Sequence, residues 1–209
     1  ARDYLASIER TRNRDWIENA RTTVIVRLVS LGGAYRQAGK LQEALEQYQR
    51  ALNSMKEWGL RYAYEGDLYR HMGEIYRQQK DFSQAVENFQ KALAMAESQG
   101  QPDKIASASR GIGYVLLYQM GKPAEAIPHY AKGIRQIEST RSLLESEEYR
   151  RSYFEGGLGA YESMTRALVE VRRQGEAFNY SERARSRAFL DLLGSKVKLS
   201  RVKSGLLGE

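Results

Sequence analysis

The 209-residue sequence contains no cysteine, and this absence removes several kinds of chemistry at once. A chain without thiols forms no disulfide framework, no thiolate metal site and no cysteine nucleophile. The absence of disulfides suits a reducing compartment, so we expect the protein to be cytoplasmic. Catalysis or metal binding would have to depend on histidine, carboxylate or hydroxyl groups instead.

Long apolar runs are also missing from the sequence. No stretch approaches the roughly 20 apolar residues that span a bilayer. Residues 1–14 lack the apolar segment of a secretory signal. We therefore expect no membrane partner. The sequence begins with Ala1 rather than methionine, which suggests a fragment of a longer protein.

The residues that usually carry catalysis are few or badly placed. His71 and His129 lie far apart with no third metal ligand near either in sequence, so packing or surface roles are favoured. Residues 33–40 superficially resemble a phosphate-binding loop, but the glycine spacing is too long and Leu41 replaces the required Ser or Thr. Carboxylates alternate with basic residues and line no apolar pocket. We predict no catalytic residues, no metal, no cofactor and no enzyme activity.

The net charge is +7, and most of this excess is spread over faces where basic and acidic residues alternate, as on solvated helices. The C-terminal end is different, because seven basic residues there accompany one acidic residue. They are Arg183, Arg185, Arg187, Lys196, Lys198, Arg201 and Lys203. Arg183 and Arg187 share a helix face, so we predict that they contact a neighbouring domain or an acidic surface. Nucleic-acid binding is the alternative.

Only three prolines interrupt a sequence rich in helix-forming residues, and the chain aligns on itself at one dominant offset of 41 residues. Three copies share a small residue, then an aliphatic residue, then an aromatic residue three positions further on. The aligned sets are Ala44, Leu45 and Tyr48; Ala85, Val86 and Phe89; and Ala126, Ile127 and Tyr130. This recurrence predicts equivalent packing positions in successive repeats.

A second helical pattern precedes each of these segments. It reads Leu31-Gly32-x-x-Tyr35 in the first copy and Met72-Gly73-x-x-Tyr76 in the second, with predicted turns at Gly39-Lys40 and Lys80-Asp81. Each copy is thus helix, turn, helix. The small residues permit two helices to approach closely, and the aromatic residues fill the spaces between them.

The third and fourth copies are less regular. Strict register places Tyr114 where the earlier copies have glycine, whereas a one-residue insertion before Gly121 places Gly113 there, and we favour the insertion. The fourth copy has Tyr161, Met164 and Leu168 on its first helix, and Ala177, Phe178 and Ala184 on its second. Gly156, Gly157 and Gly159 precede it and are predicted to loosen or break a long helix, through close packing or a loop rather than a ligand hinge.

These spacings resemble the tetratricopeptide repeat (TPR) family, whose pattern of Leu-Gly-x-x-Tyr, Ala, aromatic residue and Ala is closely met by the first two copies. The usual period is 34 residues, and the longer period here resembles the TPRs of kinesin light chains. The resemblance implies an all-α, right-handed superhelical solenoid of antiparallel helix pairs. We place the array at residues 1–193, with a leading helix before residue 25 and copies near residues 25–58, 66–99, 107–140 and 158–193. Residues 194–209 are then a basic tail or a linker to a missing domain.

Residues 177–193 resemble the last TPR helix before a CHAT domain, which is a caspase-like cysteine peptidase. The resemblance implies a regulatory or sensing array whose peptidase, with its catalytic His and Cys, lies downstream in the parent chain. A stand-alone TPR adaptor of another parent protein remains the alternative.

In the TPR family the first helix of each pair lines a concave surface that binds protein segments. Carrying the family's groove positions across by register gives the predicted peptide-binding residues, which are Arg36, Gln37, Asp67, Arg70, Glu74, Arg77, Gln78, Tyr118, Gln119 and Arg166. The same register also places Val26, Val29, Gly33 and Glu162 in the groove. Recurring arginines clamp carboxylates well, so we expect a protein or peptide partner that is acidic or mixed in charge. The alternative is that these recurring polar residues form only a solvated helix surface. The Asn and Lys residues with which some TPRs hold a C-terminal carboxylate are absent from this sequence.

Overall fold

The chain is described from a computed structural model that places residues 2–60, 64–144, 147–186 and 189. Every regular element in these ranges is a helix. The elements are α1 (Arg2–Gln37), α2 (Leu41–Trp58), α3 (Glu65–Gln78), α4 (Phe82–Ser98), α5 (Pro102–Tyr114), the short π-helix η1 (Val115–Gln119), α6 (Pro123–Leu143) and α7 (Glu147–Glu170). A final helix follows at residues 174–186.

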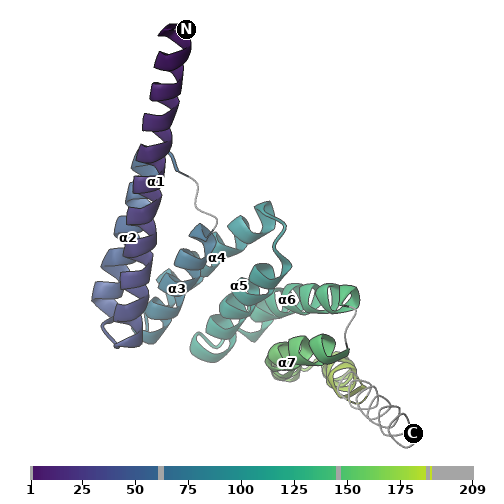
Figure 1. Cartoon of the computed structure of the whole chain (residues 1–209). Coiled ribbons are helices and arrows are strands. Elements are labelled where there is room, and N and C mark those ends of the chain that lie inside the picture. The colour runs from purple at the N-terminus through teal and green to yellow at the C-terminus, as the bar shows by residue number, and fades with distance from the viewer. Residues whose placement is uncertain (1, 61–63, 145–146, 187–188, 190–209) are drawn as a thin grey trace, which may run out of the picture.

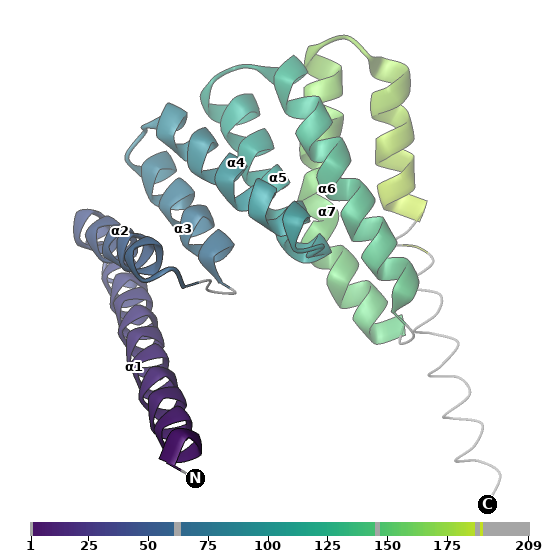
Figure 2. The same cartoon turned by 90° about the horizontal axis from the view of Figure 1, so that it is seen from above.

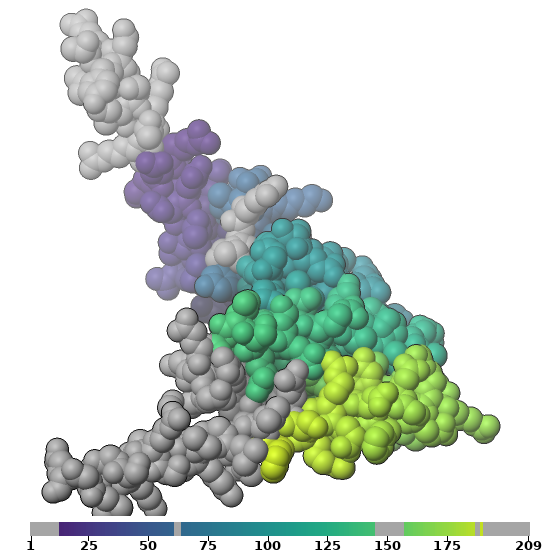
Figure 3. Space-filling view, turned by 90° about the vertical axis from the view of Figure 1, so that its right-hand side faces the viewer, coloured from purple at the N-terminus to yellow at the C-terminus, as the bar shows by residue number. Residues whose placement is uncertain are grey.

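The helices form antiparallel pairs that follow one another in sequence order (Figures 1 and 2). The pairs are α1–α2, α3–α4, α5 with η1 and α6, and α7 with the final helix. In the space-filling view the final helix forms the outer surface of the last pair (Figure 3). This arrangement confirms the predicted all-α solenoid. The predicted domain boundaries stay predictions, and the proposed tail at residues 194–209 lies outside the described residues.

Residue types at the helix ends explain where the pairs turn. Gly39 has a φ of 75° and Lys80 has a φ of 64°, so both predicted turns pass through the left-handed region that ends many helices. Asp81 precedes α4, and its side chain accepts a hydrogen bond from the Gln84 amide at 3.1 Å, which satisfies a free donor of the first turn. Pro102 opens α5, where its lack of an N–H costs nothing.

An aromatic ring pressed against a glycine spaces the two helices of each of the first three pairs. A Cβ built on the glycine would lie 2.6–3.0 Å from the ring, closer than real contacts allow. The matched residues are Tyr48 with Gly32, Phe89 with Gly73, and Tyr130 with Gly113. The alanines that mark the predicted repeat, Ala44, Ala85 and Ala126, are all fully buried. The small residues therefore mark equivalent positions where helices touch.

The third pair contains the inserted residue that we favoured from the sequence. Gly113 meets Tyr130 as Gly32 meets Tyr48, and η1 follows directly as a π-helical turn. A π-helical turn accommodates one extra residue inside an α-helix. Leu116 is 5% exposed at the position that Tyr35 and Tyr76 hold in the earlier copies. The insertion register is the one that the fold adopts.

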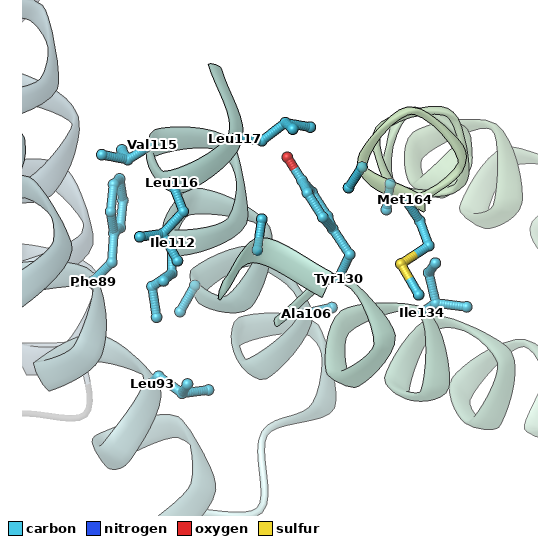
Figure 4. Close-up of a cluster of buried hydrophobic side chains, with 14 of the residues drawn as sticks. Phe89, Leu93, Ala106, Ile112, Val115, Leu116, Leu117, Tyr130, Ile134 and Met164 are labelled. Carbon is cyan, nitrogen blue, oxygen red and sulfur yellow. The ribbon is translucent and has the colours of Figure 1, made fainter. Parts of the chain in front are cut away.

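The buried side chains form two clusters along the array. The smaller cluster lies between α1, α2 and α3, and the larger extends from α4 to the final helix. Figure 4 shows Phe89 beside Val115 and Leu116, and Tyr130 of α6 between Leu117 of η1 and Met164 of α7. Tyr69 and Tyr76 of α3 are partly buried and pack against both clusters.

Three local expectations need correction or refinement. The predicted loosening or break at residues 156–159 is wrong, because α7 continues through these glycines. The close packing that was also expected of these glycines is found at Gly157, since a Cβ there would lie 2.9 Å from Ile137. Phe178 was assigned to the second helix of the fourth copy, but its side chain is 65% exposed. The aromatic residue of this helix that lies near Tyr161 is Tyr180, with 6.4 Å between the two ring centroids. The leading helix and the first helix of the array are one continuous helix, α1, which projects beyond α2 (Figure 1).

Membrane-spanning segments are not found in the described part of the chain, where no helix is both long and apolar enough to cross a bilayer.

The glycine–ring contacts predict a sharp difference between two glycine substitutions. Gly32→Ala should lower the free energy of unfolding by about 1–3 kcal/mol, because the new Cβ overlaps the buried Tyr48 ring. Gly159→Ala is the matched control, since nothing lies within 4 Å of its Cβ position and alanine favours a helix by about 0.5–1 kcal/mol. Urea denaturation followed by circular dichroism measures both. Equal stabilities for the two variants would contradict the spacing role.

Candidate peptide-binding groove

The first helices of the second and third pairs, α3 and α5, border a hollow of about 330 Å³. Three of the predicted residues, Arg70, Glu74 and Arg77, lie together on its α3 side. The complete lining is Arg70, Glu74, Arg77, Ser107, Arg110, Gly111 and Tyr114. The lining therefore comes from two successive first helices, and the predicted residues among it all lie on α3.

Ion pairs hold the charged side chains of α3 in place. Arg77 Nε donates to Glu74 Oε2 at 2.9 Å. Asp67 lies between two cations, with Lys104 Nζ at 2.8 Å and Arg70 Nε at 3.6 Å. Both predicted groove carboxylates are therefore engaged by cations of this chain. These partly buried pairs restrict the side chains before any partner arrives.

Two tyrosines and two arginines form a continuous row, which we call the tyrosine platform: Arg77, Tyr114, Tyr118 and Arg166. The Tyr114 and Tyr118 ring centroids are 4.9 Å apart. Arg77 Cζ lies 5.2 Å from the Tyr114 centroid, and Arg166 Cζ lies 5.1 Å from the Tyr118 centroid. Tyr118 Oη also donates to Ser163 Oγ of α7 at 3.2 Å. The platform crosses three successive pairs.

The inserted residue explains why the platform is aromatic at its centre. In the insertion register Tyr114 aligns with Glu74, and Tyr118 aligns with Arg77, so the extra residue keeps both tyrosines on the groove side. Their rings are 39% and 37% exposed. Sequence reasoning missed Ser107, Arg110 and Tyr114 as lining residues. In the same register Ser107 aligns with Asp67 and Arg110 aligns with Arg70, so the repeat pattern could have identified both as lining residues.

Other predicted residues lie outside the hollow. Gln37, Gln78 and Gln119 are exposed at the last positions of α1, α3 and η1. Arg36 is half-buried on α1, and its positive charge contributes to lowering the pKa of His71 on α3. The structure therefore brings the arginines, carboxylates and tyrosines of α3, α5, η1 and α7 together, and leaves the three glutamines at the helix ends.

His71 lies at the junction of the first two pairs. Its ring stacks on the Tyr48 ring with 5.9 Å between centroids. Burial lowers the pKa of His71 to about 4, with further lowering by the positive charges of Arg70 and Arg36. Burial also lowers the pKa of His129. Within the described residues no group of three or more His, Asp or Glu side chains could hold a metal ion.

The predicted contact at the C-terminal end is partly accounted for within the chain. Arg183 donates to Glu138 of α6 at 2.8 Å and lies over the Tyr180 ring. Arg185 pairs with Glu182 on its own helix. Arg183 thus fastens the final helix to α6. Arg187, predicted with it, lies outside the described residues, as do the basic residues after Phe189.

The depressed pKa of His71 predicts a pH dependence of stability. His71 titrates near pH 6.5 in the unfolded chain and near pH 4 in the folded chain, so unfolding at a pH between these values takes up a proton. The free energy of unfolding should therefore fall as the pH falls from about 6.5 toward 4, and His71→Gln should make that dependence shallower. Urea denaturation across this pH range, with NMR titration of the two histidine rings, measures both effects. A His71 midpoint at or above 6.5 would contradict the packing.

The comparisons with known proteins agree on the fold. Among solved structures, aspartyl phosphate phosphatase F from Bacillus subtilis is similar with a TM-score of 0.64 and 18% identity, over 86% of this chain and 44% of that one. The chain thus spans less than half the length of the phosphatase. MamA is similar with a TM-score of 0.59 and 20% identity, over 90% of this chain and 88% of that one.

A putative kinesin light chain from Podosopora anserina, with nearly identical TPR-like repeats, is similar with a TM-score of 0.58 and 17% identity, over 78% of this chain and 74% of that one. The search of curated proteins gives no match. The family model for the tetratricopeptide repeat matches residues 26–98 and 64–139, which together make up more than half of the sequence. The chain therefore belongs to the tetratricopeptide repeat family.

Proposed function

We propose that the chain is a protein-interaction scaffold whose groove binds an extended or helical segment of a protein partner. The observation that carries this proposal is the tyrosine platform, which presents two exposed rings between two ordered arginines across three pairs. Tyrosine and arginine are the residue types enriched where protein interfaces gain most of their binding energy. A solenoid offers such a surface along its concave side.

The order already present in the groove supports binding. Arg77 is held by Glu74, and Arg166 is held by Glu170 at 3.1 Å. Each guanidinium also lies over a tyrosine ring, so its orientation is set in the free protein. Side chains that are fixed beforehand lose less conformational entropy when a partner binds. The platform is therefore suited to a partner with apolar or aromatic side chains that cover the rings.

The charge of the groove favours a partner that is acidic or mixed in charge. Five arginines occupy the groove and its edge, against the four carboxylates Asp67, Glu74, Glu162 and Glu170. The arginines are Arg36, Arg70, Arg77, Arg110 and Arg166. Excess positive charge attracts acidic segments, speeds their association and opposes basic ones.

We also propose that the parent protein couples this groove to a CHAT peptidase. The support is the resemblance of residues 177–193 to the helix that precedes such domains. In that arrangement partner binding in the groove would regulate the downstream peptidase. A stand-alone TPR adaptor would share the groove and lack the peptidase. The parent reading frame distinguishes the two, because a CHAT domain requires a His and Cys pair within a downstream α/β domain.

The tyrosine platform predicts how binding depends on its rings. Peptides selected from a random dodecamer library on the wild-type protein should bind the double variant Tyr114→Ser with Tyr118→Ser at least about tenfold more weakly, a loss of about 1.4 kcal/mol. Both rings are more than a third exposed, so the variant should keep its helicity, although loss of the Tyr118–Ser163 hydrogen bond and of the ring contacts should lower its melting temperature. The affinities are therefore compared at a temperature where both proteins are folded. Fluorescence polarisation measures the affinities.

Phe178→Ser is the matched control, because it removes another exposed ring outside the groove. It should leave the affinities of the selected peptides within about twofold of wild type, well below the tenfold that 1.4 kcal/mol represents. Peptides that bind the double variant as tightly as the wild type would sink the proposed groove.

A further inference from the structure

The outer face of α1 carries an apolar stripe that no part of the described structure covers. Trp16 is 70% exposed, Val24 is 45% exposed and Leu31 is 44% exposed. Residues three or four positions apart lie on the same face of a helix, so these side chains belong to one continuous strip. The exposed members of the stripe are Trp16, Ala20, Val24, Arg27, Leu31 and Ala34. An exposed apolar strip of this kind marks a contact surface.

The repeat register shows what the same face does in the other first helices. Leu31 of α1 aligns with Met72 of α3 and Ile112 of α5, which are 4% and 0% exposed. Ala34 aligns with Ile75, which is also 0% exposed. Met72 and Ile75 lie in the cluster that α3 shares with the first pair, and Ile112 lies in the cluster that begins at α4. The first pair stands at the end of the array, so its copy of this face is free (Figure 2).

The polar groups beside the stripe are already satisfied within α1. An open hollow next to it is lined by Thr22, Thr23, Val26, Arg27, Ser30 and Leu31, all from this helix. The Thr22 hydroxyl donates to the Glu18 carbonyl oxygen at 2.9 Å, and the Thr23 hydroxyl donates to the Asn19 carbonyl oxygen at 2.8 Å. A partner can therefore cover both hydroxyls without leaving a buried donor unpaired.

The stripe is complementary in size to a second copy of itself. Two α1 helices can run antiparallel about a twofold axis at the middle of the stripe, so that position 20 of one copy faces position 31 of the other. Leu31 then lies over Ala20 of the other copy, and Trp16 lies over its Ala34. Large side chains thus meet small ones, as close helix packing requires. The Arg27 stem lies along Val24 of the other copy, and its guanidinium extends to solvent at the edge.

We infer that the stripe on α1 is the interface of a twofold dimer of this chain, in which the two α1 helices pack antiparallel. Closed twofold pairing of a surface with itself is the commonest form of oligomer. From Trp16 to Ala34 the stripe is about 27 Å long. A helix contact of this length buries on the order of 1,000 Å² in total, at the small end of specific interfaces. We therefore expect a reversible dimer with a micromolar dissociation constant.

Sedimentation of the 209-residue protein over a micromolar concentration series should show a monomer–dimer equilibrium. Leu31→Lys should weaken the dimer at least about tenfold, because it buries an unpaired charge against the other copy. Phe178→Lys is the matched control, since it replaces an exposed apolar side chain at the opposite end of the array, and it should change the dissociation constant less than about twofold. Circular dichroism checks that both variants keep their helicity.

A charge exchange tests the antiparallel register. Ala20→Glu alone should weaken self-association, as Leu31→Lys does. An equal mixture of these two variants should form a heterodimer within about threefold of the wild-type affinity, because the introduced glutamate then faces the introduced lysine across the interface. Ala34→Glu is the control partner for Leu31→Lys. Position 34 does not face position 31, so this mixture should not recover the affinity.

A protein that remains monomeric throughout the series would overturn the dimer, as would equal dissociation constants for wild type and Leu31→Lys. Recovery with Ala34→Glu to the same extent as with Ala20→Glu would overturn the register. Loss of association in Phe178→Lys would show that the two ends of the array meet head to tail, and the twofold dimer would then be wrong. The groove is tested separately, because its peptides are measured against the variants of Tyr114 and Tyr118.

Discussion

The contact between an aromatic ring and a glycine backbone sets the geometry on which the rest of this molecule depends. In three successive pairs a ring that is 1% exposed occupies the space where a Cβ would otherwise stand. Because protein interiors are close-packed, this contact fixes how near the two helices come and which faces they turn toward each other. The first helices are thereby aligned side by side, and the groove is formed by the faces that remain free.

The same constraint explains why the proposed binding surface lies at an irregularity of the repeat. Phe89 meets both Gly73 and Gly111, so one ring spaces its own pair and the next one. The third pair must then accommodate an extra residue without moving Gly113 from Tyr130, and it does so as a π-helical turn. Such turns are frequent at functional sites. Here the turn places two tyrosines where the preceding pair has a carboxylate and an arginine.

The sequence predicted the features that depend on repeated local pattern. The repeat alanines are buried, Gly39 makes the predicted turn, and the insertion register holds. At residues 156–159 the expected close packing is found but the expected break is not, because glycine content alone does not show that Ile137 packs against a continuous helix there. Arg36 was selected by register, but whether it has an ion-pair partner depends on the three-dimensional positions of the carboxylates, and among the described residues none pairs with it. The contacts of Tyr114 were missed because they depend on the side-chain directions that the π-helical turn sets.

The division of the buried side chains into two clusters has a consequence for cooperativity. Tyr69 and Tyr76, both only partly buried, pack against both clusters from α3. In a linear array each unit is stabilised mainly by its neighbours, so α3, which packs against both clusters, is the helix through which opening of one cluster affects the other. Arg36 of α1 lies on the side of the smaller cluster, and the tyrosine platform runs from Arg77 of α3 to Arg166 of α7 along the larger cluster. An occupant that reached from one to the other would therefore bridge the two cores, and unfolding of either core would have to release it.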